Sequence, residues 1–466
     1  MACIFHPLKR FILFFLGLCC LVGIVFYSVV FAVDSSDKAD AGKTMAVSRT
    51  IGGRVDMCLG CHKEKPDKAH AREVLGCAVC HKGNPLAGDV TEAHRGMILN
   101  PGELRFAGET CGQIGCHPRE VKWVKNSLMA TNRGIISTLR YYWGETNNHS
   151  EDISVEYLKK TGLDSPAIDY YRKLCGSCHL WVERRTLPDF LARKGGGCTA
   201  CHLAPPPEGT KKAERHPFVT RNIPMKNCIR CHNRSGRIGL SYQGEFETDG
   251  YGTPLEGGHL NNKVLKDGRF VQNLPEDVHH KAGLVCIDCH TQREVMGDGH
   301  KKAHFEEQLE ISCGICHGDK KALMAMYELN KSNDETLYPK GDKIPPYPRL
   351  KIDRKDGKFF LVGKNDKKLH ELKDPNPVSC ENPSHKRLSC QACHSTWVPQ
   401  CYGCHVRNDE GQSQLDKVAN KVTTGSWKEF KGFMRFGSPV LGVLDDLGEK
   451  GGDVGDKGKV VILVPG

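Results

Sequence analysis

Cysteine and histidine are the residues of this 466-residue chain whose types and spacing could do chemistry. A pair of cysteines followed directly by a histidine occurs ten times, nine times with two residues between the cysteines and once with four. The regular sites are Cys58, Cys61 and His62; Cys77, Cys80 and His81; Cys175, Cys178 and His179; Cys198, Cys201 and His202; Cys228, Cys231 and His232; Cys286, Cys289 and His290; Cys313, Cys316 and His317; Cys390, Cys393 and His394; and Cys401, Cys404 and His405. The longer site is Cys111, Cys116 and His117. These sites use 20 of the 24 cysteines and leave Cys3, Cys19, Cys20 and Cys380.

The Cys-x-x-Cys-His pattern is the attachment signature of c-type haem. The two thiols add to the haem vinyl groups as thioethers, and the adjacent histidine becomes the proximal ligand of the iron. Two intervening residues place both sulfur atoms on one edge of a single turn. Zinc knuckles and disulfide frameworks also use paired cysteines, but neither explains a histidine after every pair. The sequence therefore predicts about ten covalently attached haem c groups. Cys380 is expected to be a free, buried thiol.

Twelve histidines lie outside these ten sites, and His6 lies near the N-terminus. The other eleven, which are candidates for the distal ligands, are His70, His94, His149, His216, His259, His279, His280, His300, His304, His370 and His385. Eleven candidates for ten irons predict that most or all haems have a histidine on each face and no open position. Several of them lie just before a cysteine pair, as His70, His280 and His385 do, and would serve their own or a neighbouring haem. Met129 and Met225 are alternatives where a histidine is missing.

The haem sites divide the chain into two modules. We expect an N-terminal haem module over residues 57–240 with six sites and a C-terminal haem module over residues 279–405 with four. A Gly-rich insertion, residues 241–278, lies between them, and a Lys/Pro-rich insertion, residues 320–378, interrupts the second. Residues 406–466 form a tail without a haem site.

The expected fold class is mainly α with extensive irregular loops and little β, organised around a chain of about ten haems. Apolar residues at helical spacing predict two helices between residues 118 and 174. A hairpin is expected at residues 351–364, and two strands with a turn are expected near the C-terminus, in residues 440–466.

The N-terminal segment indicates export. Lys9 and Arg10 precede an uncharged apolar run over residues 11–33, and residues 34–56 form a polar tether. A basic start and an apolar run are typical of a signal peptide, but the run is also long enough to span a bilayer. Residues 1–33 are therefore either a signal peptide or an N-terminal membrane anchor. Both place the rest of the chain in the periplasm, where c-type haem is attached, and the anchor would also hold it at the cytoplasmic membrane.

Composition agrees with an interior built partly from cofactors. Hydrophobic residues make up 39% of the chain and aromatic residues 7%, which is low for a chain that must bury its own core. The formal charge of +11 is offset by the two propionates of each expected haem, so we expect the lysines and arginines to face propionates and water. No nucleic-acid partner is expected.

The chain resembles the multihaem c-type cytochromes of anaerobic bacterial respiration, and the resemblance covers residues 58–405 through the ten sites and the upstream histidines. It is similar to the octahaem group that includes hydroxylamine oxidoreductase and tetrathionate reductase. The chain has ten sites rather than eight, and it lacks both the lysine-ligated and the long-spaced haem motifs of some catalytic relatives. The small tetrahaem cytochromes share the upstream histidines and the four-residue spacing, but they are much shorter. The resemblance implies haems packed closely enough for electron hopping.

Two functions follow from these features. In the first, the chain is an electron carrier between redox partner proteins, such as a quinone-linked membrane oxidoreductase, another cytochrome or a terminal reductase. In the second, it is an oxidoreductase that acts on a small nitrogen or sulfur oxyanion (nitrite, hydroxylamine, sulfite or tetrathionate) at one open haem. The second function needs cationic donors beside that haem. The weak catalytic candidates are Arg234, Arg237, Tyr242 and His259, together with Asn233; propionate binding by the arginines is the simpler interpretation.

Overall fold

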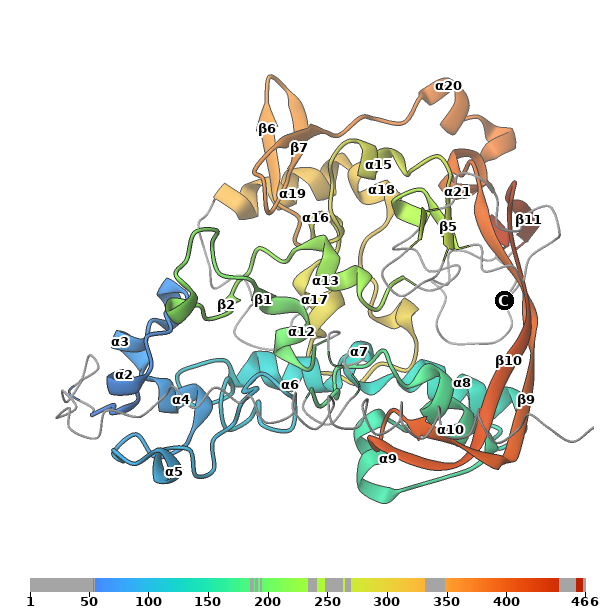
Figure 1. Ribbon diagram of the computed structural model, residues 1–466. Coiled ribbons are helices and arrows are strands. Elements are labelled where there is room, and N and C mark those ends of the chain that lie inside the picture. Colours follow the sequence, from blue (N-terminus) through green and yellow to red (C-terminus); the bar gives the residue numbers. More distant parts are fainter. Residues whose placement is uncertain are drawn as a thin grey trace, which may run out of the picture. The chain divides into compact units, whose positions relative to one another are not determined.

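The computed structural model describes residues 53, 55–184, 188, 192, 195–233, 241–247, 263–264, 270–331, 348–443 and 458–463 (Figure 1). The chain divides into two units, Met1–Val47 and Ser48–Gly466, and every described residue belongs to the second unit. The expected signal peptide or anchor, residues 1–33, lies outside the described residues. Within the described ranges, no helix has both the length and the apolar character that crossing a membrane requires.

The fold is mixed α/β, with 37% helical and 18% strand residues, so the expectation of a mainly α fold with little β was wrong. The helices are mostly single turns, and many of them coincide with the cysteine pairs. The strands form in the segments between the cysteine pairs and after them, where Val, Ile, Phe and Thr recur and pair along their main chains.

The helices of the first half begin at the first cysteine pair. They are α2 (Cys58–Cys61), η1 (Lys68–His70), α3 (Arg72–Leu75), α4 (Cys77–His81), α5 (Val90–Ala93), α6 (Pro118–Asn126), α7 (Leu128–Thr131), α8 (Arg133–Tyr142), α9 (Val155–Thr161), α10 (Pro166–Tyr170), the π-helical η2 (Tyr171–Cys175), α12 (Cys198–His202), η3 (Lys212–Glu214) and α13 (Met225–Ile229). The helices of the second half are α15 (Val278–Lys281), α16 (Cys286–Cys289), α17 (Gln292–Met296), η4 (Phe305–Glu307), α18 (Cys313–Cys316), α19 (Lys320–Lys331), α20 (Pro377–Cys380), η5 (Pro383–His385) and α21 (Cys390–His394).

The segment from 118 to 175 is more broken than its apolar spacing predicts. Its first expected helix forms as α6, α7 and α8, because the chain leaves helical geometry at Ser127 and adopts a left-handed conformation at Asn132, with φ 48°. These helices share a buried apolar cluster in which Val121, Ile136 and Leu158 are prominent. Cys111, Cys175 and Cys198 pack against this cluster, so the first side-chain core lies directly beside three cysteine pairs.

Five small antiparallel sheets complete the described structure. Their strands are β1 (Leu203–Ala204), β2 (Phe218–Val219), β3 (Glu245–Glu247), β4 (Lys263–Val264), β5 (Phe270–Asn273), β6 (Ile352–Lys355), β7 (Lys358–Val362), β8 (Leu369–Glu371), β9 (Val398–Asp416), β10 (Lys421–Gly437), β11 (Val440–Val443) and β12 (Val460–Leu463). The strand orders are β1-β2, β3-β5-β4, β6-β7-β8, β9-β10 and β11-β12.

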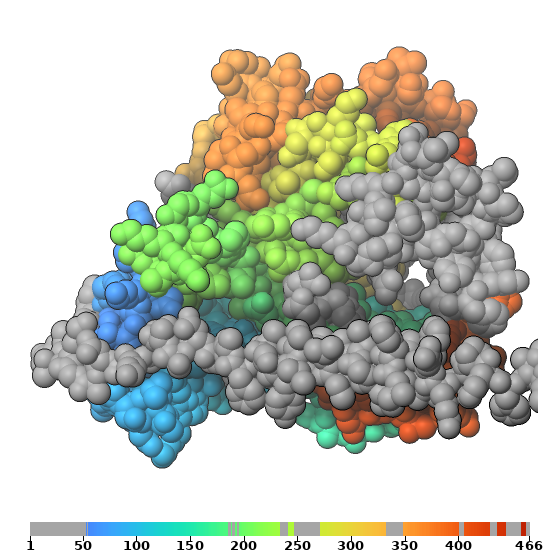
Figure 2. Space-filling model, in the orientation of Figure 1, coloured from blue at the N-terminus to red at the C-terminus, as the bar shows by residue number. Residues whose placement is uncertain are grey.

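Two of the predicted hairpins are confirmed. β6 and β7 pair through a two-residue turn at Asp356 and Gly357, whose φ angles of 49° and 78° fit the primed turns of tight hairpins. β11 pairs with β12 in antiparallel register. The β6–β7 hairpin packs on α19 around a second apolar cluster that includes Leu323, Met326 and Ile352. In Figure 2 the orange surface of this region borders the yellow surface of residues 280–320.

β9 and β10, residues 398–416 and 421–437, form a long two-stranded ribbon (Figure 1). β9 includes the last cysteine pair, and the turn between β9 and β10 packs on η2. There Asp416 accepts a hydrogen bond from Arg172 over 3.1 Å, and both side chains are buried. Trp427 of β10 donates to Asp169 over 2.7 Å. The segment expected as a tail is therefore fastened to the helices that precede Cys175.

Candidate haem-attachment sites and axial ligands

Most of the cysteine pairs lie on a single closed turn. The main-chain N–H of the motif histidine donates to the carbonyl of the first cysteine, over 2.8 Å at Cys58 and 2.9 Å at Cys286 and Cys313. The longer site has the same closure, since the N–H of His117 donates to the carbonyl of Cys111 over 2.9 Å despite the two extra residues. This bond closes the turn and holds the two sulfur atoms and the imidazole close together, which is the geometry that haem attachment needs.

Two sites differ from this pattern. Cys175 ends the π-helical η2, and the N–H of Ser177 donates back to its carbonyl over 2.7 Å. His179, which follows, is 4% exposed. The last site lies within β9, where His405 pairs with Lys431 of β10. The main chain is extended through this site, so the single closed turn expected there does not form.

The first three sites are joined in sequence order by hydrogen bonds. Asp56 is 2% exposed, and its carboxylate accepts from the N–H of Cys58 over 3.1 Å and from the N–H of Cys77 over 2.7 Å. Gln113, inside the longer site, donates to the carbonyl of Val79 over 2.9 Å. Burial and Asp56 raise the pKa of the Cys58 thiol to about 12, and nearby Cys77 adds to that rise.

Thiol contacts extend this series toward the second half of the chain. The Cys111 thiol is hydrogen-bonded to Cys198, and Cys228 is hydrogen-bonded to Cys286. A hydrogen bond from Cys198 lowers the pKa of Cys111, and a hydrogen bond from Cys228 lowers the pKa of Cys286. Asn227 ties Cys228 to the preceding site by donating to the carbonyl of Cys201 over 2.7 Å.

The series ends at the ninth site. Burial, followed by the proximity of Cys289, raises the pKa of Cys316 to about 12. Gln391, inside the next site, donates to the sulfur of Cys313 over 3.8 Å. The described cysteine pairs thus form a continuous series, with the pair at Cys175 beside the core between the third and fifth sites. None of the described cysteines forms a disulfide.

Four motif histidines each face a histidine from outside the motifs. The ring centroids of His62 and His94 are 6.0 Å apart, and those of His81 and His216 are also 6.0 Å apart. The remaining two pairs are His70 with His117 at 6.4 Å and His279 with His317 at 6.1 Å.

This spacing fits one metal ion between two imidazoles. An imidazole nitrogen binds a transition metal at about 2 Å, so two rings on opposite sides of one ion, with their own half-widths added, have centroids about 6 Å apart. The four measured separations, from 6.0 to 6.4 Å, agree with that value. The residues therefore fit a six-coordinate haem iron at these four positions.

The pairing is less local than the upstream positions suggest. His70 lies just before Cys77 but faces His117 of the following site. His216 precedes Cys228 but faces His81, more than a hundred residues earlier. His280, which precedes Cys286, packs against Tyr242 with ring centroids 5.2 Å apart.

The ring nitrogens of several histidines are oriented by main-chain carbonyls. His81 Nδ1 donates to Ile98 over 2.8 Å, His202 Nδ1 to Thr220 over 2.9 Å, and His317 Nδ1 to Lys373 over 2.8 Å. His216 and His385 make the same bond to Pro217 and Ser379 over 2.7 and 2.9 Å. A carbonyl oxygen only accepts, so Nδ1 carries the proton and the Nε2 lone pair is left for a metal. Burial also lowers the pKa values of His81 and His202, which favours their neutral forms.

Carboxylates orient a second set of histidines, and the sequence interpretation missed them. Asp67 binds His70 Nδ1 over 3.0 Å, and Asp277 binds His279 Nδ1 over 2.9 Å. Glu294 accepts from His290 Nδ1 over 2.8 Å. The hydrogen bond that His279 donates to Asp277 raises the pKa of His279. A carboxylate two to four residues from a histidine is the sequence signal that could have identified these partners.

One pair of candidate distal histidines faces each other instead of a motif histidine. The ring centroids of His149 and His304 are 4.9 Å apart, and the hydroxyl of Ser150 lies 3.1 Å from His304 Nε2. Tyr141 packs beside His149 with centroids 5.6 Å apart. His149 lies far from any cysteine pair in the sequence, and the fold brings it to His304, 155 residues later in the chain.

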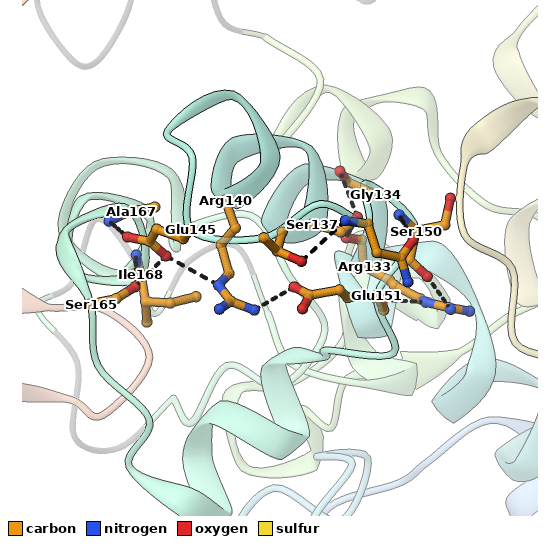
Figure 3. A network of polar contacts seen from close by, with 12 residues as sticks. Arg133, Gly134, Ser137, Arg140, Glu145, Ser150, Glu151, Ser165, Ala167 and Ile168 are labelled. Atoms are coloured by element: carbon orange, nitrogen blue, oxygen red, sulfur yellow. Dashed lines mark hydrogen bonds and ion pairs between the residues drawn. The ribbon is translucent and has the colours of Figure 1, made fainter. Parts of the chain in front are cut away.

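A partly buried polar network holds the loop that carries His149 (Figure 3). Arg140 of α8 binds Glu145 over 3.1 Å and also binds Glu151, and Arg133 donates to the carbonyl of Glu151 over 2.6 Å. Glu145 is bound further by Ser165 and by the N–H of Ala167. Burial acts to raise the pKa of Glu145, but these donors outweigh it and lower that pKa.

The other distal candidates differ in their surroundings. His300 is 63% exposed, with Asp298 3.4 Å from its Nδ1. His370 of β8 has a buried Nε2 that forms no hydrogen bond within the described part of the chain. His259 lies outside the described residues. Met129 lies in α7 and Met225 begins α13.

The weak catalytic candidates do not form a site in the described structure. Arg234 and Arg237 lie outside the described residues, and Tyr242 donates its hydroxyl to the carbonyl of Leu284 over 2.8 Å. Burial raises the pKa of Tyr242, so it stays protonated. Asn233 donates to the carbonyl of Arg230 over 3.3 Å. Cys380, expected as a buried thiol, is exposed because it ends the short surface helix α20.

Within the described ranges, no three His, Cys, Asp or Glu side chains gather as a metal-binding group. We find no protein-family model, no curated protein and no solved structure that matches this chain.

Proposed function

We propose that this chain is a multihaem c-type cytochrome that passes electrons along a series of covalently bound haems with a histidine on each face. The observation that carries the proposal is the set of four histidine pairs, each joining a motif histidine to a spare histidine at 6.0 to 6.4 Å. Zinc knuckles and disulfides give no reason for this spacing.

The residues have separate tasks in this proposal. Each cysteine pair fastens one cofactor, and its histidine occupies one axial position. The spare histidine occupies the other, which leaves no place for a substrate. The cofactor supplies reversible one-electron chemistry when it is bound. The contacts of Cys111 with Cys198 and of Cys228 with Cys286 bring attachment points of the third and fifth and of the sixth and seventh sites together, which supports short steps between neighbouring haems.

The proposal extends to the cellular location and the redox partners of the protein. Haem attachment requires export, so residues 1–33 would direct the chain to the periplasm as a signal peptide or hold it at the cytoplasmic membrane as an anchor. The partners would be a quinone-linked oxidoreductase, another cytochrome or a terminal reductase. With propionates added, the formal charge of +11 is largely neutralised, which agrees with protein partners rather than nucleic acid.

The test is haem content after expression in a host that carries a c-type haem maturation system. Intact mass should rise by about 0.6 kDa per haem, and alkaline pyridine spectra should report ten thioether-linked haems per chain. A chain that matures with zinc or disulfides and no covalent haem would overturn the proposal. Catalytic turnover of nitrite, sulfite or hydroxylamine, together with a high-spin haem signal, would favour the oxidoreductase over the electron carrier.

A further inference from the structure

Glu294 gives the motif histidine of the seventh cysteine pair a buried carboxylate partner, which the other motif histidines with a described Nδ1 partner lack. Its Oε2 atom accepts a hydrogen bond from His290 Nδ1 over 2.8 Å. The Glu294 side chain is 3% exposed. His290 is the histidine that follows Cys286 and Cys289, so the carboxylate contacts the expected proximal ligand directly.

The carboxylate is held in its charged form by several donors. It accepts main-chain N–H bonds from Thr291 over 3.1 Å and Ile311 over 2.6 Å, and a third from Glu310. Glu294 also closes a capping box at the start of α17, where Thr291 is the N-cap residue. The charge is therefore fixed in place by the fold.

The other motif histidines whose Nδ1 partners are described lack such a group. His81, His202 and His317 donate to neutral main-chain carbonyls. His62 lies 3.3 Å from Glu64, but these two side chains are about half exposed, at 51% and 41%. Water screens that pair, whereas the charge of Glu294 is buried.

The charges around Glu294 do not cancel it. Lys364 is half-buried nearby. Its Nζ donates to the carbonyl of His290 over 3.2 Å, and its main-chain N–H donates to Asp288 Oδ1 over 2.6 Å. Arg293 pairs with Glu310. Two buried carboxylates, at positions 288 and 294, thus face one lysine, and one negative charge is left in excess beside His290.

We propose that Glu294 lowers the reduction potential of the haem attached at Cys286 and Cys289, and sets it below the potentials of haems whose motif histidine donates to a carbonyl. A histidine that donates to a buried carboxylate is a stronger electron donor to its metal, and a fixed negative charge favours the ferric over the ferrous ion. Glu294 acts through His290 and is a positioning residue. The inference rests on the proposed function, because it requires a haem at this site.

A low-potential haem at the seventh site would separate the first six sites from the later ones. The seventh site lies between the sixth, which it meets through Cys228, and the eighth, which it meets through Cys316. A low-potential haem at this position is the last of its neighbours to be reduced. Electrons that cross from the N-terminal to the C-terminal sites would then pass one uphill step at His290.

The test is a spectroelectrochemical titration of the holoprotein and of Glu294→Gln. Gln keeps an oxygen acceptor and removes the charge. One haem of the ten should move to higher potential by at least a tenfold change in its ferric-to-ferrous ratio, which is 59 mV for a one-electron couple. Glu64→Gln is the matched control, because it removes an exposed carboxylate beside another motif histidine, and it should leave all potentials nearly unchanged.

Three outcomes would overturn the inference. The first is full haem content with no shift in Glu294→Gln, and the second is an equal shift in Glu64→Gln. The third needs no variant and remains decisive if Glu294→Gln fails to fold: a wild-type titration in which no haem lies below the others by this margin. A chain without covalent haem would instead refute the proposed function, so the two failures are distinguishable.

Discussion

Removing His216 should open one axial position and leave the other haems intact. His216 faces His81 with ring centroids 6.0 Å apart, and its Nδ1 donates to Pro217 over 2.7 Å. His216→Ala loses that one partly exposed hydrogen bond, which costs about 1 kcal/mol, so the protein should still fold and incorporate its haems. The spectral change should involve one site, which is about one-tenth of the haem iron.

The assay is electron paramagnetic resonance of the oxidised protein, with carbon monoxide binding to the reduced protein as a second readout. His216→Ala should convert about one-tenth of the iron from low-spin to high-spin and bind about one carbon monoxide per chain. His300→Ala is the matched control, since His300 is 63% exposed and makes no described ring contact with a motif histidine. A His216→Ala protein that stays fully low-spin, or a control with the same high-spin signal, would refute the pairing of His216 with His81.

Three further predictions concern the scaffold. Asp416→Ala should lower the free energy of unfolding by about 3–5 kcal/mol, because it leaves the buried charge of Arg172 unpaired. Glu156→Ala removes an exposed ion pair and should lower it by less than about 1 kcal/mol. Denaturant titration of both variants checks this. The folded state lowers the pKa of Glu145 below its ordinary 4.5, so ionised Glu145 contributes to the free energy of unfolding above that pH, and this contribution is lost as the pH falls through the lowered pKa. Glu145→Gln should therefore reduce stability near neutral pH and make the loss of stability on acidification smaller. Thermal melts of both proteins at several pH values check this. Gly134→Ala should destabilise by about 1–3 kcal/mol, because an added Cβ would lie 2.8 Å from a main-chain carbonyl oxygen; an unchanged melting temperature would contradict this.

The cysteine pairs could be located from the sequence because their chemistry is local. Residues spaced for one turn close that turn at Cys58, Cys286 and Cys313. The pair at Cys401 departs from this rule because residues 398–416 pair with residues 421–437 in a long ribbon. Strand pairing is a non-local interaction, and it overrides the preference that the motif spacing expresses. The same effect explains why the amount of β structure was underestimated.

The partners of the spare histidines could not be predicted because they depend on tertiary contacts. His216 reaches His81 through strand β2, which pairs with β1 directly after His202. His70 is turned toward His117 by Asp67, which caps the short helix η1 and binds the imidazole. Proximity in sequence suggested the nearest cysteine pair, but single-turn helices change the chain direction within a few residues.

The central claim is that imidazole pairs hold iron between them, and an anomalous-scattering map at the iron absorption edge of the crystalline holoprotein tests it most directly. We predict an iron atom between His62 and His94, and likewise between His81 and His216, His70 and His117, and His279 and His317, at about 2 Å from each facing nitrogen. One of these four pairs without iron between its rings in a fully loaded protein would contradict the account.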